Sequence, residues 1–177
     1  KDCHLTAPQI SIDRAKVAAK AADEKLGTNI AVIDVSNVMA ITDVFVVVSA
    51  DNERQVAAIV EEVEGDLTDL GVEPKRREGN RENRWVLLDY GNFVVHVQRE
   101  AEREFYGLDR LYADCPVIEV EGLEPYERPA AFGDEAQLRA AQHIEDLPLA
   151  GEGPADQRPV AAQVRGAHQR HPRSEEH

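Results

Sequence analysis

The stretch Trp85-Val-Leu-Leu-Asp-Tyr-Gly-Asn-Phe-Val-Val-His-Val-Gln98 decides the fold of this chain. Two runs rich in β-branched and aromatic residues flank Gly91-Asn92, a pair that tolerates the positive φ angles of a two-residue hairpin turn. The stretch therefore predicts an antiparallel hairpin. With the turn at Gly91-Asn92, the expected opposing pairs are Tyr90 with Phe93, Leu88 with Val95, and Val86 with Val97.

The hairpin is predicted to have two different faces, because successive side chains of a strand point to opposite sides. The face that holds the three opposing pairs is apolar apart from one hydroxyl, so it is expected in the core. The other face is mixed and carries Trp85, Leu87, Asp89, Val94, His96 and Gln98. Asp89 and His96 are expected as diagonal neighbours about 7 Å apart. We expect a functional site on this mixed face.

The residues before the hairpin predict the order helix, strand, strand, helix. Thr6-Ala-Pro-Gln9 fits a capping box with Thr6 as the N-cap. A helical apolar stripe follows and can end at Gly27: Ile12, Ala15, Ala19, Ala22 and Leu26. Ile30–Val35 and Val44–Ser49 are nearly continuous apolar runs, typical of strands that are covered on both faces.

A second helix is predicted after the second strand, with Asp51 or Asn52 as its N-cap. Its apolar stripe continues to Gly71: Val56, Val60, Val63, Leu67 and Leu70. The charged run Lys75–Glu78 follows Pro74 and predicts a short edge strand.

The residues after the hairpin predict a third helix over Arg99–Cys115, ended by Pro116. Its expected apolar face consists of Phe105, Leu108, Tyr112 and Cys115. Together, these elements predict the α/β class, with a small mixed β-sheet of about five strands flanked by helices.

Composition divides the chain into parts. Apolar residues are dense up to about Val120 and sparse afterwards, and six of the nine prolines lie beyond that point. We therefore expect an N-terminal segment (1–10), one folded domain (11–120) and a largely disordered C-terminal tail (121–177). A short helix within the tail is expected across Glu135 to Ile144.

The charge and the cysteine content of the chain limit the functions that it can have. The chain has 20 basic and 34 acidic residues and a net charge of −14, which disfavours direct DNA binding and favours a basic protein partner. No apolar run is long enough to span a bilayer, and no signal-peptide core is evident, so no membrane partner is expected. Cys3 and Cys115 are too few for a disulfide framework or a zinc site. These features predict a cytoplasmic protein.

Asp89 and His96 are the candidates for chemistry. Asp89 could orient His96 as a general base; alternatively, the two side chains hydrogen-bond to stabilise the hairpin or meet a partner. The sequence contains no Gly-x-Ser-x-Gly elbow and no phosphate-binding glycine loop, and its acids have the spacing of solvated helix faces. We therefore predict no catalytic residue, no cofactor and no metal. Trp85 can be a core residue, a half-buried cap or an interface anchor.

Several motifs in order resemble one family. They are Asp34-Val35, Ile41-Thr-Asp43 with Phe45-Val46, Arg54-Gln55-Val56, Arg77-Glu-Gly79, Trp85-Val-Leu-Leu-Asp-Tyr-Gly91, Val94-Val-His-Val97 and Arg103-Glu-Phe-Tyr-Gly-Leu108. Over about Ser11 to Val120, the chain resembles the ribosomal silencing factor family, also called Iojap-like, and is most similar to actinobacterial members. It departs from many members at Asp109, where they have glutamate, and at Tyr112, where they have tryptophan.

The resemblance implies a nucleotidyltransferase-like topology without catalysis. It also implies a factor that binds the large ribosomal subunit through its protein number fourteen and sterically blocks association with the small subunit. Translation would thereby be repressed under nutrient limitation, and members often form homodimers. The alternatives are a metal-dependent nucleotidyltransferase-like enzyme and a regulatory binding module with a non-ribosomal partner.

The partner-binding residues predicted from the hairpin register and the resemblance are Glu78, Trp85, Asp89, His96, Arg103 and Tyr106. Trp85 is expected to be the anchor of this contact, and the acids are expected to meet lysines or arginines of the partner.

Overall fold

The computed structural model describes residues 5–79 and 82–128 and confirms the α/β class. Its elements are α1 (Gln9–Glu24), β1 (Thr28–Asp34), β2 (Val44–Ala50), α2 (Glu53–Asp69), β3 (Arg76–Gly79), β4 (Trp85–Asp89), β5 (Phe93–Arg99), α3 (Glu100–Tyr106) and α4 (Leu108–Leu111). The predicted order helix, strand, strand, helix is present at the start. The helix predicted across Glu135 to Ile144 lies outside the described residues, as does most of the predicted tail.

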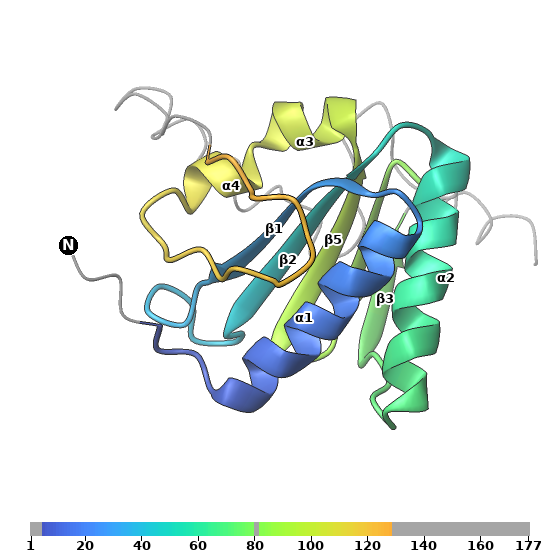
Figure 1. Cartoon of the computed structure of the whole chain (residues 1–177). Helices are drawn as coiled ribbons and strands as arrows, with labels where there is room; N and C mark the ends of the chain where they lie inside the picture. The colour runs from blue at the N-terminus through green and yellow to red at the C-terminus, as the bar shows by residue number, and fades with distance from the viewer. Residues whose placement is uncertain (1–4, 80–81, 129–177) are drawn as a thin grey trace, which may run out of the picture.

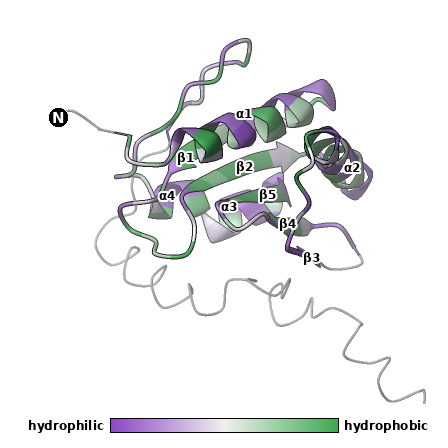
Figure 2. Cartoon of the chain, turned by 90° about the horizontal axis from the view of Figure 1, so that it is seen from below, coloured by the Kyte–Doolittle hydropathy of each residue, from purple (hydrophilic) through white to green (hydrophobic). Residues whose placement is uncertain are grey.

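One five-stranded mixed sheet organises the domain, with the strand order β1-β2-β5-β4-β3. β2 and β5 are parallel neighbours, and the other neighbouring strands pair antiparallel. α1 and α2 cover one face of the sheet, and α3 and α4 lie on the other (Figures 1 and 2). Every residue of β2 is buried, which agrees with a continuous apolar strand inside a sheet covered on both faces.

The predicted hairpin and its register are confirmed. Val86 pairs with Val97 and Leu88 with Val95. The Tyr90 amide donates to the Phe93 carbonyl at 3.0 Å, and the two rings stack with centroids 4.7 Å apart. Gly91 has a φ of 85°, which supplies the positive angle that the turn requires.

The two helices on the first face pack through the predicted stripes. The alanines of α1 are fully buried, because small side chains let the helix lie close to the sheet and α2. Asn52 caps α2, since its Oδ1 accepts from the Gln55 amide at 2.9 Å. Two residues at the ends of the stripes, Leu26 and Leu70, are exposed because they lie beyond the last helical turn.

The predicted capping box of α1 is wrong. α1 begins after Pro8, and no side chain caps it. The Thr6 and Ala7 amides instead donate to the buried Asp34 carboxylate, at 2.8 and 2.9 Å. Burial acts to raise the pKa of Asp34, but hydrogen bonds from the Ser36 hydroxyl and from the amides of Ala7, Ser36 and Thr6 lower it overall. The N-terminal segment is therefore attached to the end of β1 rather than capping its own helix.

The single third helix predicted over Arg99–Cys115 is also wrong. Gly107 adopts a left-handed conformation with a φ of 58° and divides the segment into α3 and α4. The break changes the direction of the chain, so residues before and after it do not share one face. Leu108 and Cys115 are buried as predicted, whereas Phe105 is 68% exposed.

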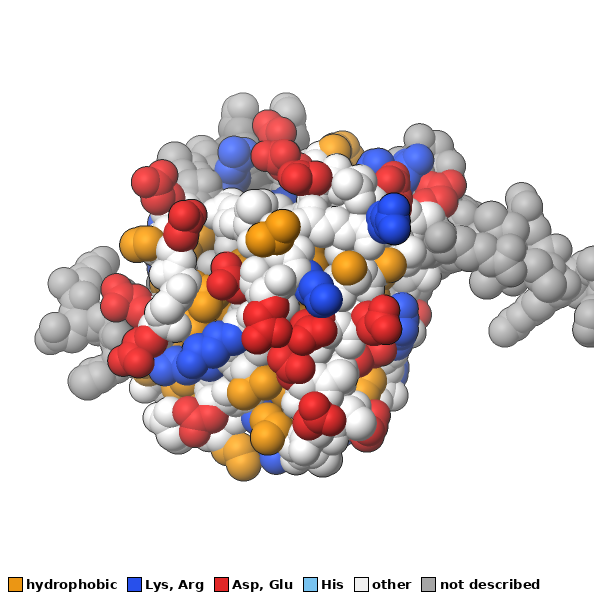
Figure 3. Space-filling view, turned by 45° about the vertical axis from the view of Figure 1, so that its right-hand side comes forward, with side chains coloured by type: hydrophobic (Ala, Val, Ile, Leu, Met, Phe, Trp, Pro, Cys, Tyr) orange, Lys and Arg blue, Asp and Glu red, His pale blue; other side chains and the backbone are white. Residues whose placement is uncertain are grey.

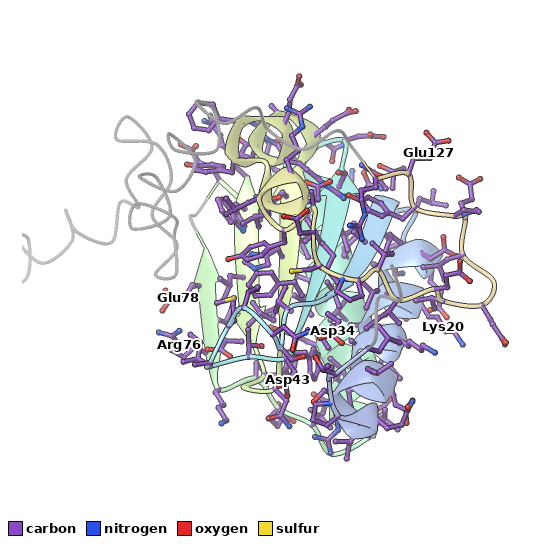
Figure 4. All side chains as sticks on the ribbon, turned by 90° about the vertical axis from the view of Figure 1, so that its left-hand side faces the viewer. Lys20, Asp34, Asp43, Arg76, Glu78 and Glu127 are labelled. Atoms are coloured by element: carbon purple, nitrogen blue, oxygen red, sulfur yellow. The ribbon has the colours of Figure 1, made fainter. Side chains whose placement is uncertain are left out.

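The two edges of the sheet differ. β3 is an edge strand as predicted, and Arg76 and Glu78 lie at the outer edge (Figure 4). The edge of β1 is covered by a short segment, since the Ile118 amide donates to the Val32 carbonyl at 2.8 Å and Ile33 bridges to Val117. Within the described ranges, none of the helices has the length and apolar character needed to cross a membrane.

Candidate partner-binding face

The structure brings the six predicted site residues to one side of the sheet. We call this side, opposite α1 and α2, the α3 face. Trp85, Leu87 and Asp89 lie on this side of β4, because every second residue of a strand points to the same side. Glu78 on β3 and His96 on β5 pair with Leu87 and so share that side. Arg103 and Tyr106 come from α3, whose Tyr106 ring lies 4.5 Å from the Trp85 ring.

Three of the six residues are buried inside the chain, which corrects the expectation that they lie on an exposed surface. Trp85 is 5% exposed, and His96 and Arg103 are each 4% exposed. Glu78, Asp89 and Tyr106 are partly exposed. Direct contact of Trp85 with a partner would require α3 to move, because the Tyr106 ring packs against it. That all six take part in binding stays a prediction.

Asp89 and His96 do not bond to each other, so neither the acid–base arrangement nor the hydrogen bond across the hairpin that the sequence left open is present. Asp89 Oδ2 accepts from Arg76 at 3.2 and 3.3 Å, and its Oδ1 accepts from the Gly91 amide at 2.8 Å. Arg76 binds this carboxylate because it lies directly opposite Asp89 on the neighbouring edge strand, β3.

His96 is a buried neutral residue. Its Nδ1 accepts a hydrogen bond from Trp85 Nε1 at 3.2 Å. The Phe45 ring meets it edge-on with centroids 5.1 Å apart. Burial lowers the pKa of His96 to about 3, because an imidazolium would lose its hydration without gaining a charged partner. Such a residue is a poor general base near neutral pH, and its evident role is structural.

A series of aromatic contacts leads from the surface into this face. Phe105 meets Tyr106 edge-on at 4.9 Å, and Tyr106 in turn contacts Trp85. Beyond His96, the Phe45 ring contacts Tyr112 at 5.3 Å. Phe105 was predicted on a buried helical face, but it is a surface residue. The glycine two residues later was the signal that the helix ends there.

Arg103 holds the base of α3. Its guanidinium donates to Asp109 at 3.2 Å, to the Ser49 hydroxyl at 3.0 Å and to the Asn29 carbonyl. Asp109 also accepts from the Tyr126 hydroxyl at 2.8 Å. Arg103 was predicted as a contact residue, whereas Tyr126 was missed because it lies in the segment assigned to the tail. This cluster joins α3, α4, both N-terminal strands and residue 126.

The carboxyl ends of the parallel strands β2 and β5 are occupied by the chain's own charges. In α/β proteins, this edge and the helix N-termini that follow it commonly bind phosphates. Here Arg99 donates to Glu53, at the start of α2, at 2.6 Å and to Glu102, on α3, at 2.8 Å. The pKa of Glu53 is lowered by its hydrogen bond to its own backbone amide and by Arg99. Carboxylates at both helix starts disfavour a phosphate ligand there.

A cluster of three acidic residues lies on α1 and α2, on the side of the molecule opposite the α3 face. Carboxylates of Glu24, Glu62 and Asp66 come within 4.8 Å of one another. Asp and Glu side chains are numerous on the face that Figure 3 turns toward the viewer. Burial, followed by repulsion from Glu62 and Asp69, raises the pKa of Asp66. Glu24 is exposed and the other two acids are partly exposed, so together they form a negative surface of the kind that repels nucleic acid.

Comparisons with known proteins place this domain. The family model described as "Ribosomal silencing factor during starvation" matches residues 8–145. The ribosomal silencing factor of Halalkalibacterium halodurans is 36% identical over 108 residues, which are 61% of this chain and 92% of that protein. That of Bacillus subtilis is 35% identical over 106 residues, which are 60% of this chain and 90% of that protein. The chloroplastic Iojap protein of Zea mays is 31% identical over 102 residues, 58% of this chain and 44% of that protein.

Two solved structures have the same fold. Protein CV0518 from Chromobacterium violaceum has a TM-score of 0.56 and 28% identity, covering 72% of this chain and 97% of its own. A Bacillus halodurans protein has a TM-score of 0.54 and 32% identity, covering 64% of this chain and all of its own. Because the family model spans most of the sequence and the bacterial relatives match over nearly their whole length, this chain belongs to the ribosomal silencing factor family.

Proposed function

We propose that this protein binds the large ribosomal subunit through its protein number fourteen and sterically blocks association with the small subunit. Translation would thereby be repressed under nutrient limitation. Membership of the ribosomal silencing factor family supports the silencing role. We assign ribosome binding to the α3 face because exposed aromatic and acidic side chains lie there above buried, hydrogen-bonded residues.

The chemistry of the α3 face suits a basic protein partner. Glu100 and Glu104 are exposed beside Phe105 on α3, and Glu78 and Asp89 lie toward the sheet edge. Acidic residues around an aromatic group speed the encounter with a positively charged surface, while the ring supplies buried area. The net charge of −14 acts in the same direction at longer range.

The proposed mechanism is steric and involves no catalysis. His96 is neutral and enclosed, and Asp89 is held by Arg76 and the Gly91 amide, so neither is poised for proton transfer. We also propose that the protein acts in the cytoplasm and forms a homodimer when it is not bound to the ribosome.

Light scattering of purified ribosomal subunits tests the proposal. Subunits are mixed at an association-promoting magnesium concentration after either the large or the small subunit has been preincubated with the protein. We expect preincubation of the large subunit to suppress the rise in scattering more strongly. Unchanged scattering at saturating protein would contradict the proposed anti-association activity.

A pair of matched variants tests the surface. Tyr106→Ala removes a partly exposed ring on the α3 face and should weaken binding to the large subunit by about 1–2 kcal/mol. Leu70→Ala removes an exposed apolar side chain at the end of α2 and should leave binding unchanged. Equal affinities of the two variants by titration calorimetry would remove Tyr106 from the contact.

A further inference from the structure

Residues 121–128, which we call the strap, lie beyond the predicted folded domain (11–120) but are attached to it. Figure 1 shows this segment, in orange, returning toward α4. Leu123 packs against the core cluster under α1 and α2, and Tyr126 packs against the cluster on the opposite face. The Arg128 guanidinium donates to the Ala113 and Cys115 carbonyls. The strap therefore contacts both sides of the sheet.

Tyr126 makes the strap's contact with a charged group. Its hydroxyl donates to Asp109 Oδ2 at 2.8 Å, and the same oxygen accepts from Arg103 at 3.2 Å. The Arg103 guanidinium carbon lies 5.9 Å from the centroid of the Tyr126 ring. Arg103 and Asp109 are buried, at 4% and 7% exposure. Hydrogen bonds to an ionised, buried acceptor are stronger than neutral ones, so Tyr126 contributes directly to holding this pair.

The pair that Tyr126 completes spans the bend between two helices. Arg103 lies on α3 and Asp109 on α4, with the left-handed Gly107 between them. Arg103 also binds Ser49 at the end of β2. Arg103 therefore attaches α3 to the sheet, and the Asp109 carboxylate, which Tyr126 holds, orients the Arg103 guanidinium for those bonds. α3 in turn carries Tyr106 on the α3 face.

Among the described residues, some polar atoms of β5, on the side of the sheet that faces α3, lack hydrogen-bond partners. His96 Nε2 and both amide atoms of Gln98 are buried without a hydrogen-bond partner in the part of the chain that the structure describes. Unsatisfied polar groups weaken the attachment of an element that covers them. The bonds among Arg103, Asp109 and Tyr126 are therefore an important part of the attachment of α3, together with the Tyr106–Trp85 ring contact and the Arg99–Glu102 ion pair.

We propose that Tyr126 is a positioning residue, through which the strap holds the α3–α4 bend in the orientation that presents the α3 face to its partner. Tyr126 itself need not touch the partner. The part of this inference that concerns affinity rests on the proposed ribosome-binding function, while the hold of the strap on α3 stands apart from it.

Hydrogen exchange of the full-length chain tests the hold on α3. Tyr126→Phe removes only the hydroxyl, and we expect amides in residues 99–113 to exchange about tenfold faster while those of α1 are unchanged. Tyr90→Phe is the matched control, since its buried hydroxyl has no hydrogen-bond partner within the described ranges. It should leave both regions unchanged. Unaltered exchange in residues 99–113 of Tyr126→Phe, or faster exchange throughout the chain, would overturn the inference.

Binding to purified large ribosomal subunits tests the positioning role. We expect Tyr126→Phe to bind about threefold to tenfold more weakly than the wild type, and Tyr90→Phe to bind equally well. Faster local exchange with unchanged affinity would refute positioning of the contact face. If the wild-type protein fails to bind, the proposed function fails, and Tyr126 loses its role in partner recognition; the exchange experiment still decides whether the strap holds α3.

Discussion

Mild acid should destabilise this protein because of one buried side chain. The pKa of His96 is lowered from 6.5 to about 3 by burial among aromatic rings, so the folded protein keeps this imidazole neutral. The unfolded chain binds a proton near pH 6.5. The stability that depends on neutral His96 is therefore complete above pH 6.5 and is lost as the pH falls toward 3.

The size of the effect follows from the two pKa values. Between 6.5 and 3, each pH unit should lower the free energy of unfolding by about 1.4 kcal/mol. From pH 7 to pH 5, the expected loss is about 2 kcal/mol. This window lies above the ordinary pKa values of aspartate and glutamate, so carboxylate protonation contributes little to it.

Urea unfolding followed by far-ultraviolet circular dichroism at pH 7, 6 and 5 measures this loss. His96→Asn is the control, because an Asn Oδ1 takes about the place of the imidazole Nδ1 and can still accept from Trp85 Nε1. The smaller side chain should cost about 1–3 kcal/mol at pH 7, but its pH dependence should be flatter than that of the wild type. Equal slopes for the two proteins would refute the assignment of acid sensitivity to His96.

Other substitutions test single features of the structure. Asp109→Asn leaves Arg103 without its buried counter-charge and should cost about 3 kcal/mol in urea unfolding. Asn52→Ala removes the N-cap of α2 and should cost about 1 kcal/mol in the same measurement. Asp66→Asn should raise the thermal midpoint slightly at pH 7 but not at pH 3, because the raised pKa of Asp66 reflects a charge that the folded state disfavours. Gly107→Ala forces a Cβ into a left-handed conformation and should cost about 1–2 kcal/mol.

Local signals in the sequence predicted much of the fold. The hairpin register followed from Gly91-Asn92, because turn length and side-chain alternation together leave one pairing. The start of α2 followed from Asp51-Asn52, since either side chain can satisfy a free amide of the first turn; in the structure Asn52 does so. In each case the interacting groups are close in sequence, so the pattern contains the physical cause.

The burial of the candidate site could not be predicted in the same way. Strand alternation assigned Trp85 and His96 to one face but did not specify what covers that face. The cover is α3, whose Tyr106 ring packs on Trp85 and whose Arg103 binds Asn29 and Ser49, residues far away in the sequence. Likewise, the partner of Asp89 depended on the register of β3 against β4, which a short charged run does not determine.

The burial of Trp85 changes how its contribution to binding can be measured. Trp85→Ala would remove a core side chain that contacts Tyr106 and donates to His96, at a cost of about 3–5 kcal/mol in stability. Weaker binding by that variant would follow from a displaced α3 as readily as from a lost anchor. Trp85→Phe keeps a six-membered ring that can contact Tyr106 and loses the pyrrole ring with its N–H donor to His96. If Trp85 supports binding only by holding α3 in place, a substitution of Trp85 that weakens binding to the large subunit should also speed hydrogen exchange in residues 99–113.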